Sequence, residues 1–251
     1  MSKLITHREG HYQFLTGIDP YSCGVVATPG QEIVHVTLRR RLPWREGFER
    51  VDRFLADQKL PRTALCAMEL RSPAPFTMAG FIDFNRGYCA VLDAWGLKVD
   101  QLNPLARTNV APVYDLPETP SLHGFSFVRP QAGLSQRTFV VAGAGELREG
   151  TLDARGIIRC GEVSAEAMHE KARYVLEVMD ERLHGLGAEW DQITAVNIYT
   201  VHPLDTQLRA LLVQKLGLAL QRGIVWHWTR PPVQDIEFEM DLRGVVTEWV
   251  I

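Results

Sequence analysis

The sequence is poor in cysteine, and its four cysteines form no pattern that metal or disulfide chemistry uses. No Cys-x-x-Cys pair occurs and no histidine lies at metal-ligand spacing from the four, which are Cys23, Cys66, Cys89 and Cys160. This spacing argues against a zinc site and against a disulfide framework. We expect free thiols in a reducing compartment and no bound metal.

Long apolar runs and a strong net charge are also absent. No stretch approaches the roughly 20 apolar residues of a membrane span, and residues 1–10 contain no apolar signal core. The formal charge is −3, and the only basic run, Arg39 to Arg41, is typical of a solvated strand end. We expect a cytoplasmic protein that binds neither membrane nor nucleic acid, in which local cations would hold any anionic ligand.

The first half of the chain alternates between strand-like and helix-like segments. Apolar residues recur at steps of four, three and four along one helix face, at Trp44, Phe48, Val51 and Leu55. A second apolar stripe, which ends at Gly96, consists of Phe81, Phe84, Tyr88 and Leu92. The pattern predicts helices at 44–58 and 76–95, and strands at 32–38, 63–70, 108–114 and 125–128.

The second half repeats this order. Ser164 is a candidate N-cap for a helix ending at Gly185, whose apolar stripe is Met168, Ala172, Val175, Met179 and Leu183. The other predicted elements are a helix at 205–220 and strands at 137–142, 193–201, 223–229 and 236–246. Both halves therefore read β-α-β-α-β-β, with an offset of about 115 residues that places Arg107 on Arg222. A polar linker at 129–136 divides the chain into predicted domains at 1–129 and 130–251.

Two charged residues of the second half are candidates for chemistry. Arg222 begins a predicted strand, and Glu237 follows fifteen residues later, after a turn at 229–232. A guanidinium offers a planar fork of donors that suits a carboxylate, and a glutamate can orient or deprotonate a water molecule. On spacing alone, a structural ion pair or two exposed charges explain the same residues.

Four short motifs, taken together, resemble the Rid/YjgF family of imine and enamine deaminases. The chain matches the family's closing motif with Arg222 and Ile236-Glu237-Phe238-Glu239. The other three matches are Pro20-Tyr21-Ser22, Asn85-Arg86-Gly87-Tyr88 and Leu105-Ala106-Arg107-Thr108. Their order covers nearly the whole chain when it is read as two copies of one module. The resemblance implies a chorismate-mutase-like fold, a homotrimer, and active sites in clefts between subunits.

The resemblance also implies roles for individual residues. Arg222 would hold a substrate carboxylate, Glu237 would position the attacking water, and the backbone of Gly143 would help to seat the substrate. Further substrate contacts are expected from Arg107, Tyr21, Asn85, Tyr88 and His123. Water would add to the imine carbon, and ammonia would leave to give a keto acid, without a metal or an organic cofactor.

Departures from the family pattern leave two arrangements open. Ala142 stands where the family has a serine, and Ile224 stands where it has a small residue or cysteine. In the first half, Leu122 and His123 occupy the place of the water-holding glutamate. Either the two halves contribute to one composite site, or one half has become scaffold.

These observations lead to one interpretation and two alternatives. We expect an α+β protein of two tandem Rid-like domains, with the sheets packed inside and the helices outside. We also expect it to form a homo-oligomer, a trimer. Its expected activity is hydrolytic deamination of a carboxylate-bearing imine or enamine of the 2-aminoacrylate or 2-aminomuconate type. The alternatives are a chorismatase-like enzyme and a ligand-binding or regulatory protein without chemistry. Only a catalytic protein requires an acid–base residue in the same cleft as the arginine.

Overall fold

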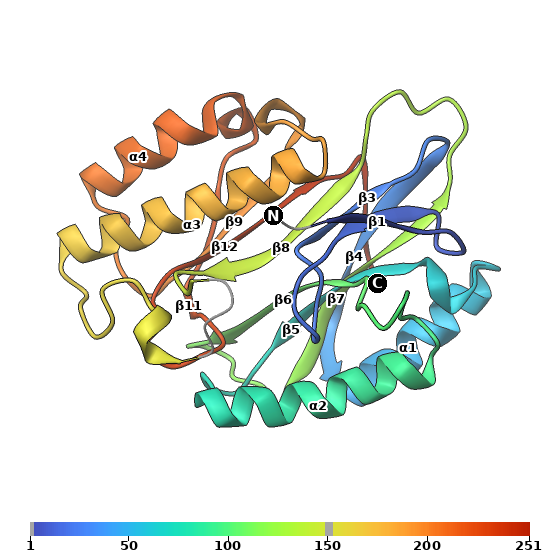
Figure 1. Ribbon diagram of the computed structural model, residues 1–251, viewed down its shortest axis with the longest axis horizontal. Coiled ribbons are helices and arrows are strands. Elements are labelled where there is room, and N and C mark those ends of the chain that lie inside the picture. Colours follow the sequence, from blue (N-terminus) through green and yellow to red (C-terminus); the bar gives the residue numbers. More distant parts are fainter. Residues whose placement is uncertain (1–2, 149–152) are drawn as a thin grey trace.

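The computed structural model describes residues 3–148 and 153–251 as two β-sheets that face each other, with helices on their outer sides (Figure 1). Each sheet has one helical layer, so the molecule consists of four layers. This α+β arrangement, with sheets inside and helices outside, confirms the predicted fold class.

The first sheet has seven strands in the order β1-β2-β3-β8-β12-β9-β10. Its helical layer is α3 (Ala165–Gly185) and α4 (Thr206–Leu216), whose apolar faces pack on β8, β9 and β12. The strands are β1 (Leu4–His7), β2 (Tyr12–Leu15), β3 (Gly24–Ala27), β8 (Phe139–Gly145), β12 (Glu239–Gly244), β9 (Ala195–Tyr199) and β10 (Val225–His227).

The second sheet has six strands in the order β11-β6-β5-β7-β4-β13. It is covered by α1 (Trp44–Asp57) and α2 (Met78–Ala94). The strands are β11 (Thr229–Arg230), β6 (Ala106–Pro112), β5 (Leu65–Arg71), β7 (Ser121–Pro130), β4 (Gln31–Pro43) and β13 (Thr247–Val250). Short 3-10 turns lie at η1 (Arg62–Ala64), η2 (Ala154–Gly156), η3 (Trp190–Gln192) and η4 (Gly217–Arg222).

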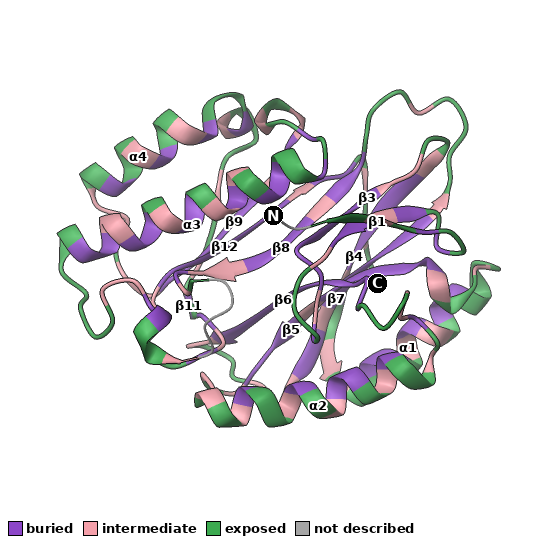
Figure 2. Cartoon of the chain, in the orientation of Figure 1, coloured by how far each residue is buried: buried purple, intermediate pink, exposed green. Residues whose placement is uncertain are grey.

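The helices form where the apolar stripes predicted them. The hydroxyl of Ser164 accepts a hydrogen bond from the backbone N–H of Ala167 at 3.2 Å and caps α3. All five residues of the stripe predicted for this helix are buried, and Figure 2 shows the helices with buried and exposed faces. No helix in the described residues has both the length and the apolar character needed to cross a membrane.

The ends of the chain cross between the two sheets. Strand β3 pairs with β8 of the second half, and β1 and β2 extend the same sheet. Conversely, β13 runs parallel to β4 at the edge of the first half's sheet. The four strands β1, β2, β3 and β13 were not predicted from the sequence. The division at residue 129 stays a prediction, because strands of one half join the sheet of the other half at three places: β1 to β3, β11 and β13.

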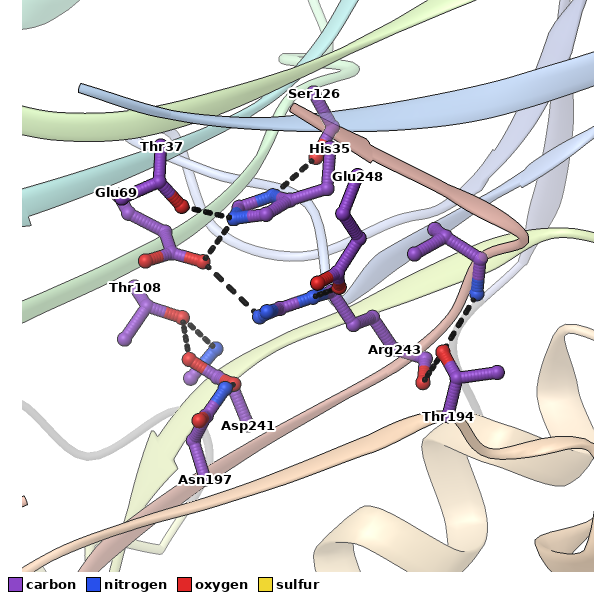
Figure 3. Close-up of polar contacts among 12 residues, drawn as sticks. His35, Thr37, Glu69, Thr108, Ser126, Thr194, Asn197, Asp241, Arg243 and Glu248 are labelled. Carbon is purple, nitrogen blue, oxygen red and sulfur yellow. Dashed lines mark hydrogen bonds and ion pairs between the residues drawn. The ribbon is translucent and has the colours of Figure 1, made fainter. Parts of the chain in front are cut away.

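The space between the sheets is apolar at one end and polar at the other. The apolar part includes the buried side chains of Tyr12, Phe14 and Val25. In the polar part, Figure 3 shows Arg243 between Glu69 and Glu248, and its guanidinium lies 3.5 Å from Glu69 and 2.8 Å from Glu248. This polar part also contains the buried carboxyl group of Asp241 (Figure 3).

Candidate active site

A cavity of about 450 Å³ opens where strand β6 of one sheet approaches β8 and β12 of the other. The segment at 16–23, helix α2 and the segment at 232–236 close its sides. Its polar lining comes from both halves of the chain: Tyr21, Arg107, Asn109, Arg148, Arg182 and Glu239. Among the described residues, cations and one carboxyl group thus surround a mostly apolar space, which suits a small organic anion.

Arg107 lies on β6 with its guanidinium inside a cage of aromatic rings. The guanidinium carbon lies 4.8 Å from the ring centre of Tyr88 and 5.1 Å from that of Tyr21, distances typical of cation–π contacts. The residue is 3% exposed, and its Nη1 has no hydrogen-bond partner among the described residues. Burial lowers the pKa of Arg107. A buried cationic donor without an acceptor indicates a place for an anionic ligand.

Asn109 lies two residues further along β6 and faces the same way as Arg107, because strand side chains alternate. The hydroxyl of Ser72 donates to Asn109 Oδ1 at 3.0 Å, which fixes the orientation of the amide. Its Nδ2 is buried without an acceptor in the described part of the chain. Strand β6 therefore presents two unsatisfied donors beside the cavity.

Glu239 is the carboxyl group of the cavity and begins strand β12. It is 4% exposed. Burial raises its pKa well above the usual range, and the carboxyl groups of Asp241 and Glu146 raise it further. A protonated fraction of Glu239 is thus retained at higher pH than for an exposed glutamate, which suits a residue that donates and accepts a proton.

Gly143 brings the strand β8 close to this carboxyl group. A Cβ atom at residue 143 would collide with Glu239 Oε1 and would crowd the side chain of Thr108. The backbone N–H of Gly143 donates to Thr108 Oγ1 at 3.1 Å, and Thr108 in turn donates to Asp241 at 2.7 Å. Figure 3 shows Thr108 and Asn197 meeting Asp241 from opposite sheets. This chain of hydrogen bonds holds the cavity wall to the polar layer between the sheets.

Arg182 supports the same wall from helix α3. Its guanidinium donates to the carbonyl oxygens of Ala142 at 3.1 Å and Gly143 at 3.3 Å. The side chain also lines the cavity, close enough to Glu239 for its charge to favour the ionised carboxylate. A helix of the outer layer therefore adds positive charge to the site.

Three of the residues predicted from motifs line this cavity: Tyr21, Arg107 and Gly143. Tyr88 lies behind Arg107 as part of the aromatic cage. Asn85 lines a neighbouring cavity of about 530 Å³ on the side of α2. His123 lines a separate groove beside the basic run at 39–41.

The structure does not bring Arg222 and Glu237 into the cavity. Arg222 ends the turn η4, and its Nη1 donates to the carbonyl oxygen of Ile193 at 3.1 Å. The carboxylate of Glu237 lies 2.8 Å from His202 Nε2 and 3.4 Å from Arg230 Nη1. Motif spacing alone did not single out Asn109, Arg182 or Glu239. Strand alternation from Arg107 would have pointed to Asn109.

No group of three potential metal ligands of the His, Cys, Asp or Glu type occurs within residues 3–148 and 153–251. The polar side chains that line the cavity carry guanidinium, amide, phenol and carboxyl groups, which suit an organic anion.

Comparison with known proteins gives matches over the full chain. Residues 4–249 match the family model described as 2-aminomuconate deaminase CnbZ. The chain is 39% identical over 253 residues to the 2-amino-5-chloromuconate deaminase of Comamonas testosteroni, with full coverage of both proteins.

Solved structures give more distant matches. A chorismatase superposes with a TM-score of 0.54 at 11% identity, over 97% of this chain and 86% of the chorismatase. This likeness shows a shared fold and nothing about activity. The YjgF protein of E. coli matches 43% of this chain and 80% of its own at 16% identity, with a TM-score of only 0.28. Membership in the Rid family and a tandem repeat stay predictions.

Proposed function

The chain belongs to the 2-aminomuconate deaminase CnbZ family, and we propose that it hydrolytically deaminates 2-aminomuconate or a close derivative. The products would be ammonia and the corresponding 2-keto dicarboxylic acid. The proposal places the reaction in the cavity between β6 and β12, with Arg107 as the carboxylate-binding residue and Glu239 as the acid–base residue.

One observation carries this assignment. Arg107 is buried with a donor that has no partner among the described residues, in the same cavity as a carboxyl group whose pKa is raised. A protein that only bound a carboxylate would need the arginine alone. The addition of Glu239 gives the site a group that can move protons, which favours catalysis over simple binding.

The charge of the cavity fits a dicarboxylate. Arg107 lies on the β6 side, whereas Arg148 and Arg182 line the cavity from the second half. A 2-aminomuconate molecule carries a carboxylate at each end of a six-carbon chain. Cations contributed by both halves would hold the two ends, and the apolar side chains of Met78 and Phe81 would face the carbon chain.

The reaction follows from these positions. The protonated carboxyl group of Glu239 gives its proton to a carbon of the enamine, and the C2–N bond becomes a protonated imine. A water molecule then adds its oxygen to C2 and gives a proton back to the carboxylate, which leaves a hydroxyl and a neutral amino group on C2. Glu239 returns this proton to the nitrogen, the C–N bond breaks, and ammonia leaves. The carboxylate takes the proton of the C2 hydroxyl group as the ketone forms. The carboxyl group ends in the protonation state in which it began.

The decisive test compares matched glutamate variants. We expect Glu239→Gln to lower kcat for ammonia release from 2-aminomuconate by about 10²–10⁴-fold, because the proton-transfer group is removed. Arg107→Ala should lower kcat/KM by about 10–150-fold, the value of one hydrogen bond to a charged group. Glu237→Gln makes the same chemical change outside the cavity. Loss of activity in Glu237→Gln with full activity in Glu239→Gln would restore the motif-based assignment instead.

A wild-type protein that bound muconate but released no ammonia from any imine would support the non-catalytic alternative. Binding of muconate, which lacks the amino group, can be measured by calorimetry without turnover. The chorismatase-like alternative has only the shared fold in its favour.

A further inference from the structure

A fully buried ion pair lies directly behind the acid–base residue. Lys171 Nζ on helix α3 lies 3.0 Å from Glu146 Oε1, and both side chains are 0% exposed. Lys171 also donates to the carbonyl oxygen of Ile158 at 2.8 Å. Glu146 follows the last residue of β8, next to the cavity-lining Gly145. The pair therefore connects the outer helix to the cavity wall.

The carboxylate of Glu146 also holds the backbone just before Glu239. It accepts the N–H of Glu237 at 2.7 Å on one oxygen and the N–H of Phe238 at 3.0 Å on the other. Pairing of β12 with β8 starts only at Glu239, which is opposite Gly145. Residues 237 and 238 belong to no strand. The side chain of Glu146 thus provides the hydrogen-bond acceptors that a neighbouring strand would otherwise provide for the two residues before Glu239.

Stability does not explain a charged pair at this place. The cost of removing two charges from water largely cancels their attraction, so an apolar pair of similar volume is often as stable. An apolar pair, however, would leave the backbone N–H groups of residues 237 and 238 without acceptors. The charged pair instead fixes the position of the backbone at residues 237 and 238.

We propose that Glu146, held by Lys171, is a positioning residue that sets the location of the Glu239 carboxyl group in the active site. The inference rests on the proposed function, in which Glu239 moves the proton. Arg107, which binds one of the two carboxylates, lies on the other sheet, away from the hydrogen bonds of the pair. Disruption of the pair should therefore lower kcat much more than the affinity for a carboxylate ligand.

The charges around Glu239 give a second readout. Burial raises the pKa of Glu239 most, the carboxylates of Asp241 and Glu146 raise it further, and guanidinium groups from α3 and β6 lower it. The charged groups that face it are Asp241, Glu146, Arg182 and Arg107, and the phenol of Tyr21 lies in the same field. Burial also raises the pKa of Glu146, whereas Lys171 and the backbone donors favour its ionised form. Removal of the Glu146 charge should lower the pKa of Glu239.

The experiment uses two double variants of the full chain. Glu146→Leu/Lys171→Met removes both charges and both acceptors, and Glu146→Gln/Lys171→Met removes the charges but keeps one amide acceptor for the backbone. The control is Glu32→Leu/Arg129→Met, which removes a partly buried pair at 2.6 Å that does not line the cavity. Each protein is measured for kcat with 2-aminomuconate, for muconate binding, and for the titration of ¹³C-labelled Glu239.

We expect the Leu/Met variant to lose about 10²-fold in kcat, the usual effect of a misplacement near 1 Å, while muconate binding changes less than about threefold. The Gln/Met variant should recover part of kcat, and in both variants Glu239 should titrate at lower pH. The control should keep its kcat even if it is less stable. Unchanged kcat, or equal losses of kcat, binding and stability, would overturn the proposal.

The titration of Glu239 distinguishes a failure of the positioning role from a failure of the proposed function. If the wild type releases no ammonia, the proposed function fails. Both double variants lack the Glu146 charge, so a Glu239 titration that moves further in the Leu/Met variant than in the Gln/Met variant then supports the positioning role, and equal shifts overturn it.

Discussion

Glu239 shows how a single buried residue can couple catalysis to stability. Burial disfavours its charged form, so its pKa in the folded state lies above that in the unfolded state. The folded protein therefore binds more protons between the two pKa values, and this residue lowers stability as pH rises through that window. The same raised pKa that serves proton transfer destabilises the protein at alkaline pH.

We expect Glu239→Gln to be more stable than the wild type at pH 8, with a difference that shrinks toward pH 4.5. The neutral amide cannot ionise, so the variant does not lose the stability that ionisation of Glu239 costs the wild type at alkaline pH. Urea unfolding at several pH values measures the effect, with Glu237→Gln as the matched change two residues away. A difference that was constant with pH would show that Glu239 titrates alike in the folded and unfolded chain.

The sequence placed Arg107 among the substrate contacts, but it gave the carboxylate-binding role to Arg222, which lies outside the cavity. The motif at 105–108 identified Arg107, and the structure places it in the cavity. The closing motif directed attention to Glu237, but β12 begins only at Glu239, and Glu237 instead contacts His202 and Arg230. Which of two neighbouring glutamates enters a cleft depends on where the strand starts. Here Glu146 accepts hydrogen bonds from the backbone N–H groups of the two residues before the strand, and sequence patterns do not reveal this contact.

At the scale of elements, predictions were accurate where the signal was local. Helix α3 spans Ala165–Gly185, and its N-cap and apolar stripe had been identified. Strands β1, β2, β3 and β13 were missed because each has only four residues. Strand β13 pairs with β4, about two hundred residues earlier in the chain. Such pairing is stabilised by contacts that no sequence window contains.

The last of these strands makes a testable contribution to stability. Trp249 on β13 packs with ring centres 5.7 Å from Phe127 and 6.0 Å from Phe54. We expect Trp249→Ala to lower the free energy of unfolding by about 2–3 kcal/mol, less than for a fully buried tryptophan because the ring is half-buried. Val250→Ala, on the neighbouring exposed side chain, should cost less than about 0.5 kcal/mol. Equal urea midpoints for the two variants would mean that β13 is not part of the cooperative fold.

At the scale of the whole molecule, the cavity exists only because the two halves pack together. Its lining comes from β6 of the first half and from β8 and β12 of the second. Sequence patterns could place each residue on its element, but they could not predict which edges of two separate sheets would meet. The trimer implied by the Rid resemblance stays a prediction, which light scattering on the purified chain would test.

The polar interface between the sheets also predicts sensitivity to acid. Burial, and after it the charge of Arg71, lower the pKa of His227 to about 4 and that of His123 to about 3. The ring of His227 stacks on Tyr199 at 4.7 Å, and its Nε2 lies 3.1 Å from Asn197 Oδ1. The two histidines come from different sheets, so protonation would place new positive charge beside Arg71 where the sheets meet.

The direction of the effect follows from the two pKa values. The folded state binds fewer protons than the unfolded state between pH 6.5 and about 4, so stability should fall as pH decreases through this range. We expect His227→Gln, which keeps a donor for Asn197, to reduce this loss by about 1–2 kcal/mol at pH 4.5, after allowance for partial exposure. Urea unfolding at pH 7.5 and 4.5 measures it, with His169→Gln on the outer helix α3 as the control. If both variants lost stability as the wild type does, the acid sensitivity would arise elsewhere than at the meeting point of the two sheets.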